Sequence, residues 1–481
     1  MPVHQRPAKR TKIVATIGPA CESEEVLRQM ILAGMDVARL NFSHGSADTL
    51  RPVVARLKKL RDELNVPLAI LGDLRGPRVR VGEIEGGSTW LEEGQTFRLT
   101  PQALVGNSHQ ASVSYLHLGR DVVPGCKILL DDGNIELRVE SVEPNGDVLA
   151  RVVQGGKLSS RRGLNLPGRR VSLPSITEKD YADIDFAIEE GFDFLALSFV
   201  QSAADVRQLN EYLARRGASI PVIAKIERQN ALEDIEAIVQ EAYGVMVARG
   251  DLALEMSIQE APIAQKRIIA ACRQVGTPVI TATQMLESMV EAHKPTRAEA
   301  TDVANAILDG TDALMLSGET ALGAHPVRVV ATMAAIAQAT EQAWFAGKLP
   351  PPPALSPPKE IEPTVAYASH VVADTLNARV IVAFTTSGAT ATRVACHRPR
   401  RPVLALSASP RTRQRLALIW GVESALTDII KATDEMIEVG LAQARQCGLA
   451  APGDTVVIIA GTPPYGQSGR TNTLKVERIP E

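Results

Sequence analysis

The sequence predicts an α/β protein built from parallel βα units, on two observations. Short apolar runs rich in β-branched residues recur along the chain, and longer amphipathic helical patterns separate them. One helical pattern, 24–34, closes with a glycine suited to a helix C-cap. Units of this kind can close a (β/α)8 barrel or form an open doubly wound sheet, and the pattern alone leaves that choice open. The expected strands are 12–18, 37–42, 68–73, 194–200, 221–227, 243–251, 278–284 and 312–319.

The βα pattern is interrupted at two places, which predicts further domains. Between the third and fourth runs the chain is rich in Gly, Val and alternating segments, and DDGN within 127–142 predicts a turn between two strands. After the eighth run, a proline-rich stretch predicts an extended linker and no helix or sheet. The expected parts are barrel 1–76, inserted β domain 77–171, barrel 172–347, linker 348–364 and C-terminal α/β domain 365–481.

Composition excludes several classes of function. The 481 residues exceed what one core usually holds, and 45% apolar with 22% charged residues is typical of an ordinary soluble globular protein. Lys and Arg number 52 against 55 Asp and Glu, a balance that gives no electrostatic footprint for nucleic acid or an acidic membrane. No apolar stretch approaches the roughly 18 residues of a membrane span. Five scattered cysteines without a CxxC pair predict reduced thiols in a cytoplasmic protein.

Charged residues at the ends of two expected strands are the strongest chemical signal. Lys225 and Glu227 lie in VIAKIE, and Asp251 lies in VMVARGD. A cation between two carboxylates suggests a divalent metal, most simply Mg2+, beside an anionic, phosphorylated substrate. Taken singly, each residue could equally be a surface ion pair or a helix cap. No P-loop occurs and no GxGxxG follows a strand, so nothing here points to a nucleotide without further information.

A series of longer motifs in a fixed order resembles the pyruvate kinase family. The resemblance runs from TKIVATIGPA to TNTLKV and so covers nearly the whole chain. It favours the (β/α)8 barrel, an inserted small β-barrel lid, a regulatory C-terminal domain and a homotetramer. It implies phosphoenolpyruvate and ADP as substrates, with Mg2+ or Mn2+ as cofactor. The motifs are RLNFSHG (39–45), AKIE (224–227), MVARGDL (246–252), TPVITATQMLESM (277–289) and PTRAEATDVANAILDGTDALMLSGETA (295–321).

The resemblance also assigns roles to residues of the catalytic site. Glu227 and Asp251 match the ligands of the divalent metal, and Lys225 matches the cation that faces the transferred phosphoryl group. Gly250, beside Asp251, matches the backbone that binds the substrate carboxylate. Thr283 matches a position near the carbon that receives a proton, where a hydroxyl is a poor acid. A water chain through Ser317 and Glu319 is the more plausible proton source.

Residues further upstream match the phosphate, nucleotide and potassium positions of the family. Arg39 matches the phosphate-binding arginine, and a guanidinium suits bidentate recognition of phosphate. Positions near ADP are matched by Asn41, His44 and Arg80. The potassium site of the family is matched by Asn41, Ser43, Asp73 and Leu74.

One segment departs from the family pattern. GDLRGPRVR (72–80) has Leu74 and Arg78 where potassium-dependent members resemble DTKGPEIR. Members with Leu and Lys at these places resemble a class that needs no monovalent cation. A fixed side-chain cation at Arg78 can take over the charge of potassium, so we expect K+ not to be required. The alternative is a solvated arginine without function.

The C-terminal domain contains a second candidate site. FTTSGATA (384–391) follows an expected strand and opens a helix, which suits either a bound phosphate or a simple N-capped helix. The resemblance implies an effector site here, formed by Thr385, Thr386, Ser387, Gly388 and Thr390. The fructose-bisphosphate-regulated animal forms carry a Lys and an Arg in this loop and a Trp-Arg in a later one, where this chain has Thr386, Ala389 and TPPYGQSGR (462–470). A phosphorylated sugar or a nucleotide monophosphate is therefore the expected effector.

Two other functions account for part of the sequence. A metal-dependent barrel aldolase or lyase acting on pyruvate or phosphoenolpyruvate would also use Lys225, Glu227 and Asp251, but it needs neither lid nor regulatory domain. A sugar-phosphate sensor with a decayed site is disfavoured because Arg39 and Thr283 are intact.

Overall fold

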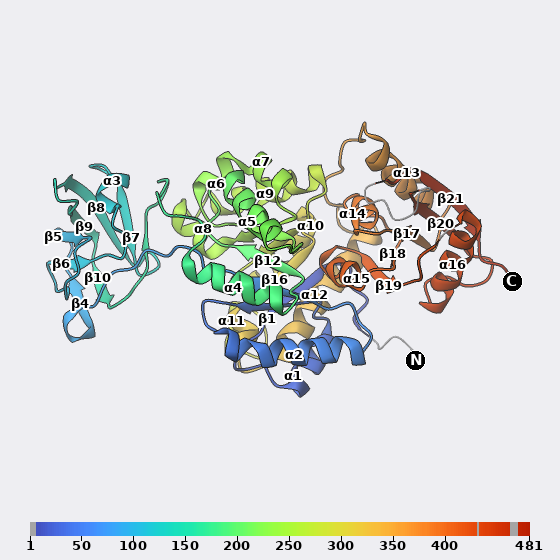
Figure 1. Cartoon of the computed structure of the whole chain (residues 1–481), viewed down its shortest axis with the longest axis horizontal. Helices are drawn as coiled ribbons and strands as arrows, with labels where there is room; N and C mark the ends of the chain where they lie inside the picture. Colours follow the sequence, from blue (N-terminus) through green and yellow to red (C-terminus); the bar gives the residue numbers. More distant parts are fainter. Residues whose placement is uncertain (1–5, 431, 462–469) are drawn as a thin grey trace.

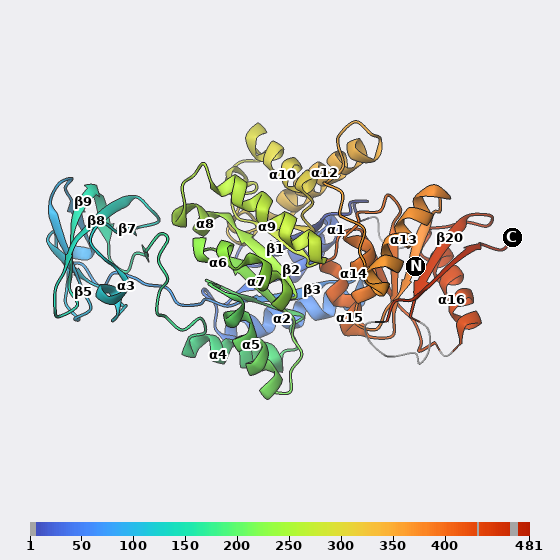
Figure 2. The ribbon, with the colours of Figure 1, turned by 90° about the horizontal axis from the view of Figure 1, so that it is seen from above.

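The structure, a computed structural model, describes residues 6–430, 432–461 and 470–481. The molecule is elongated, with a barrel in the middle, a β-rich domain at one end and a C-terminal α/β domain at the other (Figures 1 and 2). No helix in the described ranges is both long and apolar enough to cross a bilayer.

The central domain is a closed parallel barrel, in strand order β1-β16-β15-β14-β13-β12-β3-β2. All eight expected strands are present, so the alternative of an open sheet is wrong. The strands end earlier than expected: 243–251 was expected to be one strand, yet a helix begins at Arg249 because the backbone turns directly after Ala248. The strands are β1 (Lys12–Thr16), β2 (Val37–Asn41), β3 (Ala69–Asp73), β12 (Phe194–Leu197), β13 (Val222–Ile226), β14 (Gly244–Ala248), β15 (Val279–Ala282) and β16 (Ala313–Leu316).

Helices surround the barrel and bury one apolar face each. The first illustrates how sequence sets the bounds: the Ser23 hydroxyl accepts the Val26 N–H at one end, and Gly34, at φ 121°, closes the other. Leu27, Met30 and Ile31 form its buried face. The helical segments are α1 (Glu24–Ala33), α2 (Ala47–Glu63), α4 (Glu178–Glu189), α5 (Ala203–Arg215), α6 (Gln229–Glu233), α7 (Ile235–Glu241), α8 (Arg249–Glu255), α9 (Ala261–Val275), η2 (Glu287–Val290), α10 (Arg297–Asp309), α11 (Gly318–Ala321) and α12 (Pro326–Phe345).

The inserted domain lies between β3 and β12 and has its own apolar core. It contains a six-stranded sheet, β11-β7-β8-β9-β5-β6, and a two-stranded sheet, β10-β4. The expected DDGN turn joins β7 to β8, with Asp131 and Asp132 at positive φ. The elements are η1 (Glu85–Gly87), β4 (Ser88–Leu91), β5 (Thr96–Thr100), β6 (Gln110–Ser112), α3 (Leu118–Asp121), β7 (Lys127–Leu130), β8 (Ile135–Val142), β9 (Val148–Gln154), β10 (Gly156–Ser159) and β11 (Leu164–Asn165).

The C-terminal domain is built on a five-stranded sheet, β19-β18-β17-β20-β21. Its first helix begins at Ile361, so the expectation of extended linker through residue 364 is wrong for the last four residues. Pro363 is tolerated there because it lies in the first turn, where a helix does not use the missing N–H. The elements are α13 (Ile361–Thr375), β17 (Val380–Phe384), α14 (Ala389–Ala395), β18 (Val403–Ser407), α15 (Pro410–Arg415), η3 (Leu416–Leu418), β19 (Val422–Leu426), α16 (Thr433–Gln446), β20 (Thr455–Ala460) and β21 (Thr473–Arg478).

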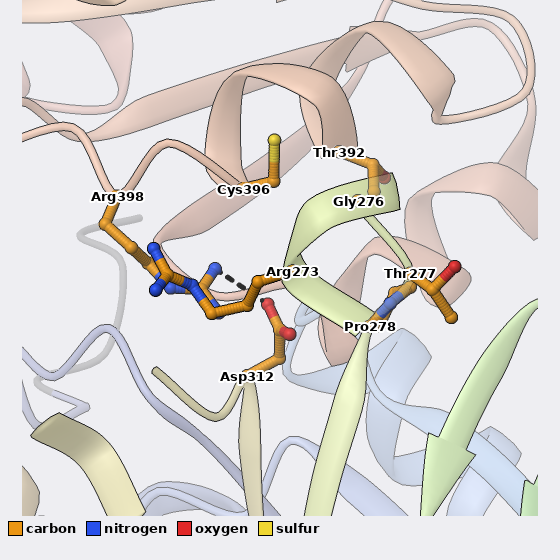
Figure 3. A pocket seen from close by; sticks show the side chains of 8 residues that line it. All are labelled: Arg273, Gly276, Thr277, Pro278, Asp312, Thr392, Cys396 and Arg398. Carbon is orange, nitrogen blue, oxygen red and sulfur yellow. Dashed lines mark hydrogen bonds and ion pairs between the residues drawn. The ribbon is translucent and has the colours of Figure 1, made fainter. Parts of the chain in front are cut away.

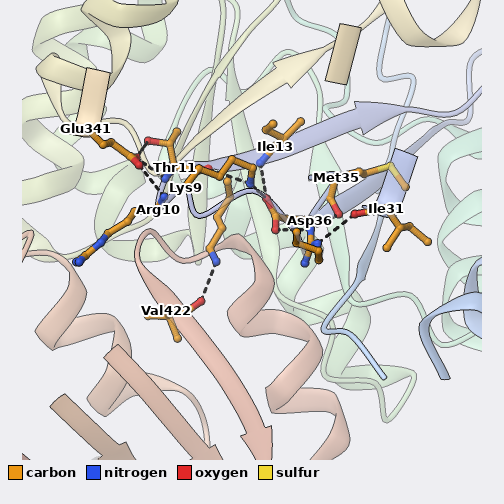
Figure 4. Close-up of polar contacts among 11 residues, drawn as sticks. Lys9, Arg10, Thr11, Ile13, Ile31, Met35, Asp36, Glu341 and Val422 are labelled. Atoms are coloured by element: carbon orange, nitrogen blue, oxygen red, sulfur yellow. Dashed lines mark hydrogen bonds and ion pairs between the residues drawn. The ribbon is translucent and has the colours of Figure 1, made fainter. Parts of the chain in front are cut away.

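The C-terminal domain packs against the amino ends of the barrel strands. Ala417 and Leu418 of η3 are buried in one apolar cluster with barrel-interior residues such as Val14. The side chain of Arg10 donates to the backbone oxygens of residues 399, 400 and 401, and Lys12 Nζ donates to the Val422 oxygen at 2.7 Å. Figure 4 shows Val422 of the C-terminal domain below the segment that contains Arg10 and Thr11. This docking closes the amino end and leaves the carboxyl end of the barrel facing the inserted domain.

Candidate active site

Four side chains from the carboxyl ends of neighbouring strands form one buried polar network. Arg39 Nε, on β2, bonds Asp73 Oδ2, on β3, at 2.7 Å. Lys225 Nζ, on β13, lies 3.1 Å from Asp73 Oδ1 and 2.6 Å from the hydroxyl of Ser198, which follows β12. Adjacent parallel strands bring these positions together although they are up to 186 residues apart in sequence, from Arg39 to Lys225. The site therefore presents two cations and one shared carboxylate.

Glu227 and Asp251 extend this network toward the candidate metal position. Glu227 Oε1 lies 3.0 Å from Lys225 Nζ, and its Oε2 accepts the Phe199 N–H at 2.6 Å. Phe199 has φ 56°, a costly conformation for an aromatic residue, and it aims this N–H at the carboxylate. Asp251, half-buried on α8, is close enough for its charge to act on Glu227.

Burial and neighbouring charges oppose each other throughout this cluster. Burial raises the pKa of Asp73, but the charges of Lys225 and Arg39 outweigh it and hold that pKa below its ordinary value. Burial lowers the pKa of Lys225, yet Asp73 and Glu227 raise it more, so the ammonium stays charged. For Glu227, burial and the charge of Asp251 raise the pKa despite Lys225. A divalent cation bound between Glu227 and Asp251 would relieve the repulsion between the two carboxylates.

The donor set at this position suits a hard divalent metal. Two carboxylates supply oxygen, the ligand type that Mg2+ prefers, and the remaining ligands would come from substrate and water. Within the described ranges no group of three or more His, Cys, Asp or Glu side chains could hold a metal by itself. Glu227 and Asp251 therefore fit an Mg2+ ion that is shared with a bound anion.

Gly250 and Thr283 lie together beside this cluster. The Gly250 N–H donates to Thr283 Oγ1 at 2.9 Å. Thr283 follows β15 and has φ 65°, which is strained for a β-branched residue. The guanidinium of Arg249 stabilises this turn by donating to the Thr283 oxygen at 2.7 Å. Backbone strain of this kind is characteristic of functional sites.

Ser317 and Glu319 follow β16 and differ sharply in their bonding. Both oxygens of Glu319 accept backbone N–H groups, one from Leu286 at 3.1 Å and one from Ser317 at 2.6 Å. Glu319 is fully buried and ties the loops after β15 and β16 together. The Ser317 hydroxyl is buried without a partner within the described ranges, so it is available to a water or substrate.

The residues matched to the potassium site do not form a complete set of oxygen ligands. Leu74 is 1% exposed and packs into the barrel core. Both oxygens of Asp73 are engaged by cationic side chains. Asn41 Oδ1 accepts the Ser43 N–H at 3.0 Å. Arg78 is exposed, with its guanidinium carbon 5.7 Å from the Phe199 ring centre, and it forms no ion pair in the part of the chain described here.

A group of arginines lies where the inserted domain joins the barrel. Arg80 Nη1 donates to the Arg161 oxygen at 2.8 Å. Burial lowers the pKa of Arg80, and the nearby charges of Arg78 and Arg75 lower it further. Three arginine charges near one acid, Asp132, suit a polyphosphate. His44 is exposed beyond the end of β2.

The candidate effector loop is ordered by its own hydroxyl groups. Thr385 Oγ1 accepts the Gly388 N–H at 2.9 Å, and Thr390 Oγ1 lies 2.9 Å from Thr471 Oγ1 in a buried contact. Thr386 and Ser387 are exposed. The second loop expected to bear on effector choice, 462–470, lies outside the described residues except for Arg470.

Three residues of the network escaped sequence reasoning. Ser198 links Lys225 to the Leu74 backbone oxygen, Phe199 fixes Glu227, and Thr16 Oγ1 accepts from Arg39 Nη1 at 2.8 Å. An uncharged residue at a strand end carries no distinctive signal. Their position at the carboxyl ends of β1 and β12 was the one indication available.

The fold and this site define a (β/α)8-barrel enzyme with a charged anion site at the carboxyl ends of its strands. Comparison with known families is decisive: the pyruvate kinase barrel domain matches residues 8–330, and the pyruvate kinase alpha/beta domain matches residues 363–477. The chain belongs to the pyruvate kinase family and is a phosphotransferase.

Individual relatives agree along almost the whole chain. A pyruvate kinase of Mycobacterium tuberculosis (strain CDC 1551 / Oshkosh) is 43% identical over 473 residues, covering 98% of this chain and 99% of the relative. One from Geobacillus stearothermophilus is 45% identical over 478 residues, covering 98% of this chain and 80% of the relative. The crystal structure of a Cryptosporidium parvum pyruvate kinase superposes with a TM-score of 0.91 at 35% identity, covering 98% of this chain and 96% of that one.

Proposed function

We propose that this enzyme transfers the phosphoryl group of phosphoenolpyruvate to ADP, giving ATP and pyruvate in the cytoplasm. The observation that carries this proposal is the network of Arg39, Asp73, Lys225 and Glu227 at the open end of the barrel. It holds positive charge beside carboxylates in a largely dry site, where electrostatic stabilisation of a transferred phosphoryl group is strongest.

Each group in the network has a role that its contacts support. Lys225 keeps its proton and would face the phosphoryl group and the enolate oxygen as charge develops there. Arg39, held by Asp73 and Thr16, would bind phosphoryl oxygens. Mg2+ or Mn2+ held by Glu227 and Asp251 would neutralise substrate oxygens. The N–H region of Gly250 and Asp251 would receive the substrate carboxylate.

The enolate carbon would receive its proton from the side of the site where Thr283 lies. Among the described residues the Ser317 hydroxyl has no hydrogen-bond partner and would hold a water there, whereas both oxygens of Glu319 are engaged by backbone groups. Glu319 therefore acts by positioning Ser317 and the neighbouring loop.

The nucleotide is proposed to lie between the barrel mouth and the inserted domain. Asn41 and His44 border this region, and the arginine group of Arg75, Arg78 and Arg80 can neutralise ADP phosphates. Because Leu74 is an apolar core residue and Asp73 already pairs with two cations, we propose activity without potassium.

Regulation and assembly complete the proposal. Thr385, Thr386, Ser387, Gly388 and Thr390 would bind a phosphorylated sugar or nucleotide monophosphate, supported by the exposed hydroxyls of Thr386 and Ser387. A homotetramer is proposed from the family alone.

The test is ATP formation from phosphoenolpyruvate and ADP with Mg2+, in KCl and in NaCl at equal ionic strength. Turnover in both salts within about twofold is expected, since a fixed arginine replaces the mobile charge. Turnover only in KCl would retain the reaction and refute potassium independence. Pyruvate release without ATP would instead indicate a lyase.

A further inference from the structure

A second cavity lies at the opposite end of the barrel from the catalytic site. It has a volume of about 760 Å³, is open to solvent on one side, and is bordered by the amino end of the barrel, the proline-rich linker and the start of α14. Sites for small molecules usually fall between about 300 and 1,000 Å³ and favour domain junctions. The cavity is thus large enough for a metabolite and is formed by three parts of the chain at once.

The linker wall of this cavity is fixed by side-chain bonds. Arg273 Nη1, from α9, donates to the Pro353 oxygen at 2.7 Å. Thr364 Oγ1, from the first turn of α13, donates to the Pro358 oxygen at 3.1 Å. The proline-rich segment is therefore held at Pro353 and at Pro358, on either side of Leu355 and Ser356, which line the cavity.

The charged side chains lining the cavity are mostly cationic. Three cationic residues line it, Arg393, Arg415 and Lys359, and one carboxylate, Glu360. Arg393 Nη1 and Arg415 Nε are buried and have no hydrogen-bond partner within the described ranges. Both arginines line the cavity and are only half-buried, so their other guanidinium N–H groups can donate to an anion there, although Arg415 Nη2 already donates to the Ser219 oxygen.

An inner pocket continues from the cavity toward the barrel and adds more positive charge (Figure 3). Its volume of about 10 Å³ leaves room for roughly one water. Arg398 pairs with Asp312 at 2.9 Å, which leaves Arg273 without a carboxylate partner in the described chain. Burial and the charge of Arg398 together lower the pKa of Arg273 to about 10, against the charge of Asp312, which raises it.

We propose that the cavity between barrel, linker and α14 binds a small organic oxyanion, with its phosphate or carboxylate group against Arg393 and Arg415. The amides of Gln240 and Gln274 and the hydroxyl of Thr392 line the same space and suit the uncharged polar body of such a molecule. A free metabolite of this class fits this volume.

The cavity borders the candidate effector loop without coinciding with it. Ser387, Gly388 and Ala389 line the cavity, whereas Thr385, Thr386 and Thr390 do not. The cavity is also independent of the chemistry at Lys225, so its test does not depend on catalytic activity.

The experiment is calorimetric titration of the full chain with inorganic phosphate, and in parallel with citrate, at constant ionic strength. Phosphate that binds near Arg39 gives the same heat with wild type and with each variant. A difference in binding between the proteins therefore reports on the cavity. Arg393→Gln should weaken one saturable site by about tenfold or more through loss of a charge-assisted bond. Arg400→Gln is the matched control, because this exposed arginine lies seven residues further on and does not line the cavity.

The outcomes separate the two candidate sites. The proposal is supported if Arg393→Gln loses the saturable anion site in the titration and Arg400→Gln keeps it. Equal binding in wild type and Arg393→Gln overturns it, as does loss confined to Thr386→Val, which would locate the anion at the effector loop. Arg415→Gln provides a second test if Arg393→Gln melts well below wild type, and retention of the site there would likewise overturn the proposal.

Discussion

The two ends of the barrel use the same kinds of buried ion pair for different purposes. At the carboxyl end, Arg39 and Lys225 share Asp73, and Glu227 and Asp251 add two further carboxylates that a divalent cation would balance. At the amino end, Arg398 bonds Asp312 and the Gly310 oxygen, joining the C-terminal domain to the barrel. The charges of the first end suit a metal and its anionic ligand, whereas the Arg398–Asp312 pair at the second end stabilises the docking of two domains.

The largest expected effect comes from removing the central cation of the carboxyl end. Lys225→Met should lower kcat by about 10³ or more, because the ammonium is held where phosphoryl and enolate charge would develop. Steady-state ATP formation measures this, with circular dichroism to confirm folding. A loss below tenfold would contradict the role of Lys225.

The corresponding change at the amino end should affect stability in place of catalysis. Arg398→Met leaves buried Asp312 without its cation and should cost about 3 kcal/mol of unfolding free energy. Urea unfolding measures the cost, while kcat of the folded enzyme should stay within about twofold. Arg400→Met, at an exposed arginine nearby, is the control and should change stability by less than about 0.5 kcal/mol. A large fall in kcat for Arg398→Met would show that the two ends are not separable.

The sequence predicted the functional residues of the carboxyl end better than the contacts of the amino end. Lys225, Glu227 and Asp251 were predictable because they fall together in motifs that match the family in order, although each alone could be a surface ion pair or a helix cap. Ser198 and Phe199 were missed because a hydroxyl or ring at a strand end is also a common packing residue. Arg398 and Asp312 are 86 residues apart and lie in different domains, and no periodicity encodes such a contact. The eight barrel strands were predictable from local pattern, whereas α13 began inside a proline-rich stretch whose composition suggested a linker.

Acid should act on the amino end through His397, beside the proposed anion cavity. Burial lowers its pKa to about 4, and the neighbouring charges of His370, Arg273 and Arg398 act in the same direction. The unfolded chain therefore binds the proton more readily, so this contribution to stability is complete above about pH 6.5 and is lost as pH falls toward 4. Between pH 7 and pH 5 wild type should lose about 2 kcal/mol more than His397→Gln. Equal acid sensitivity of the two proteins, measured by urea unfolding at each pH, would show that His397 is not responsible.

The smallest expected effect concerns the monovalent cation at the carboxyl end. Arg78→Glu removes a fixed positive charge beside Phe199 and introduces the carboxylate that potassium-dependent members have. Activity in KCl relative to NaCl should then rise from within about twofold to about threefold or more, because a mobile cation would replace the lost charge. Arg98→Glu, on β5 of the inserted domain, is a matched charge reversal and should leave that ratio unchanged. An unchanged ratio in Arg78→Glu would mean that the cations at Arg39 and Lys225, which already pair with Asp73, suffice without Arg78.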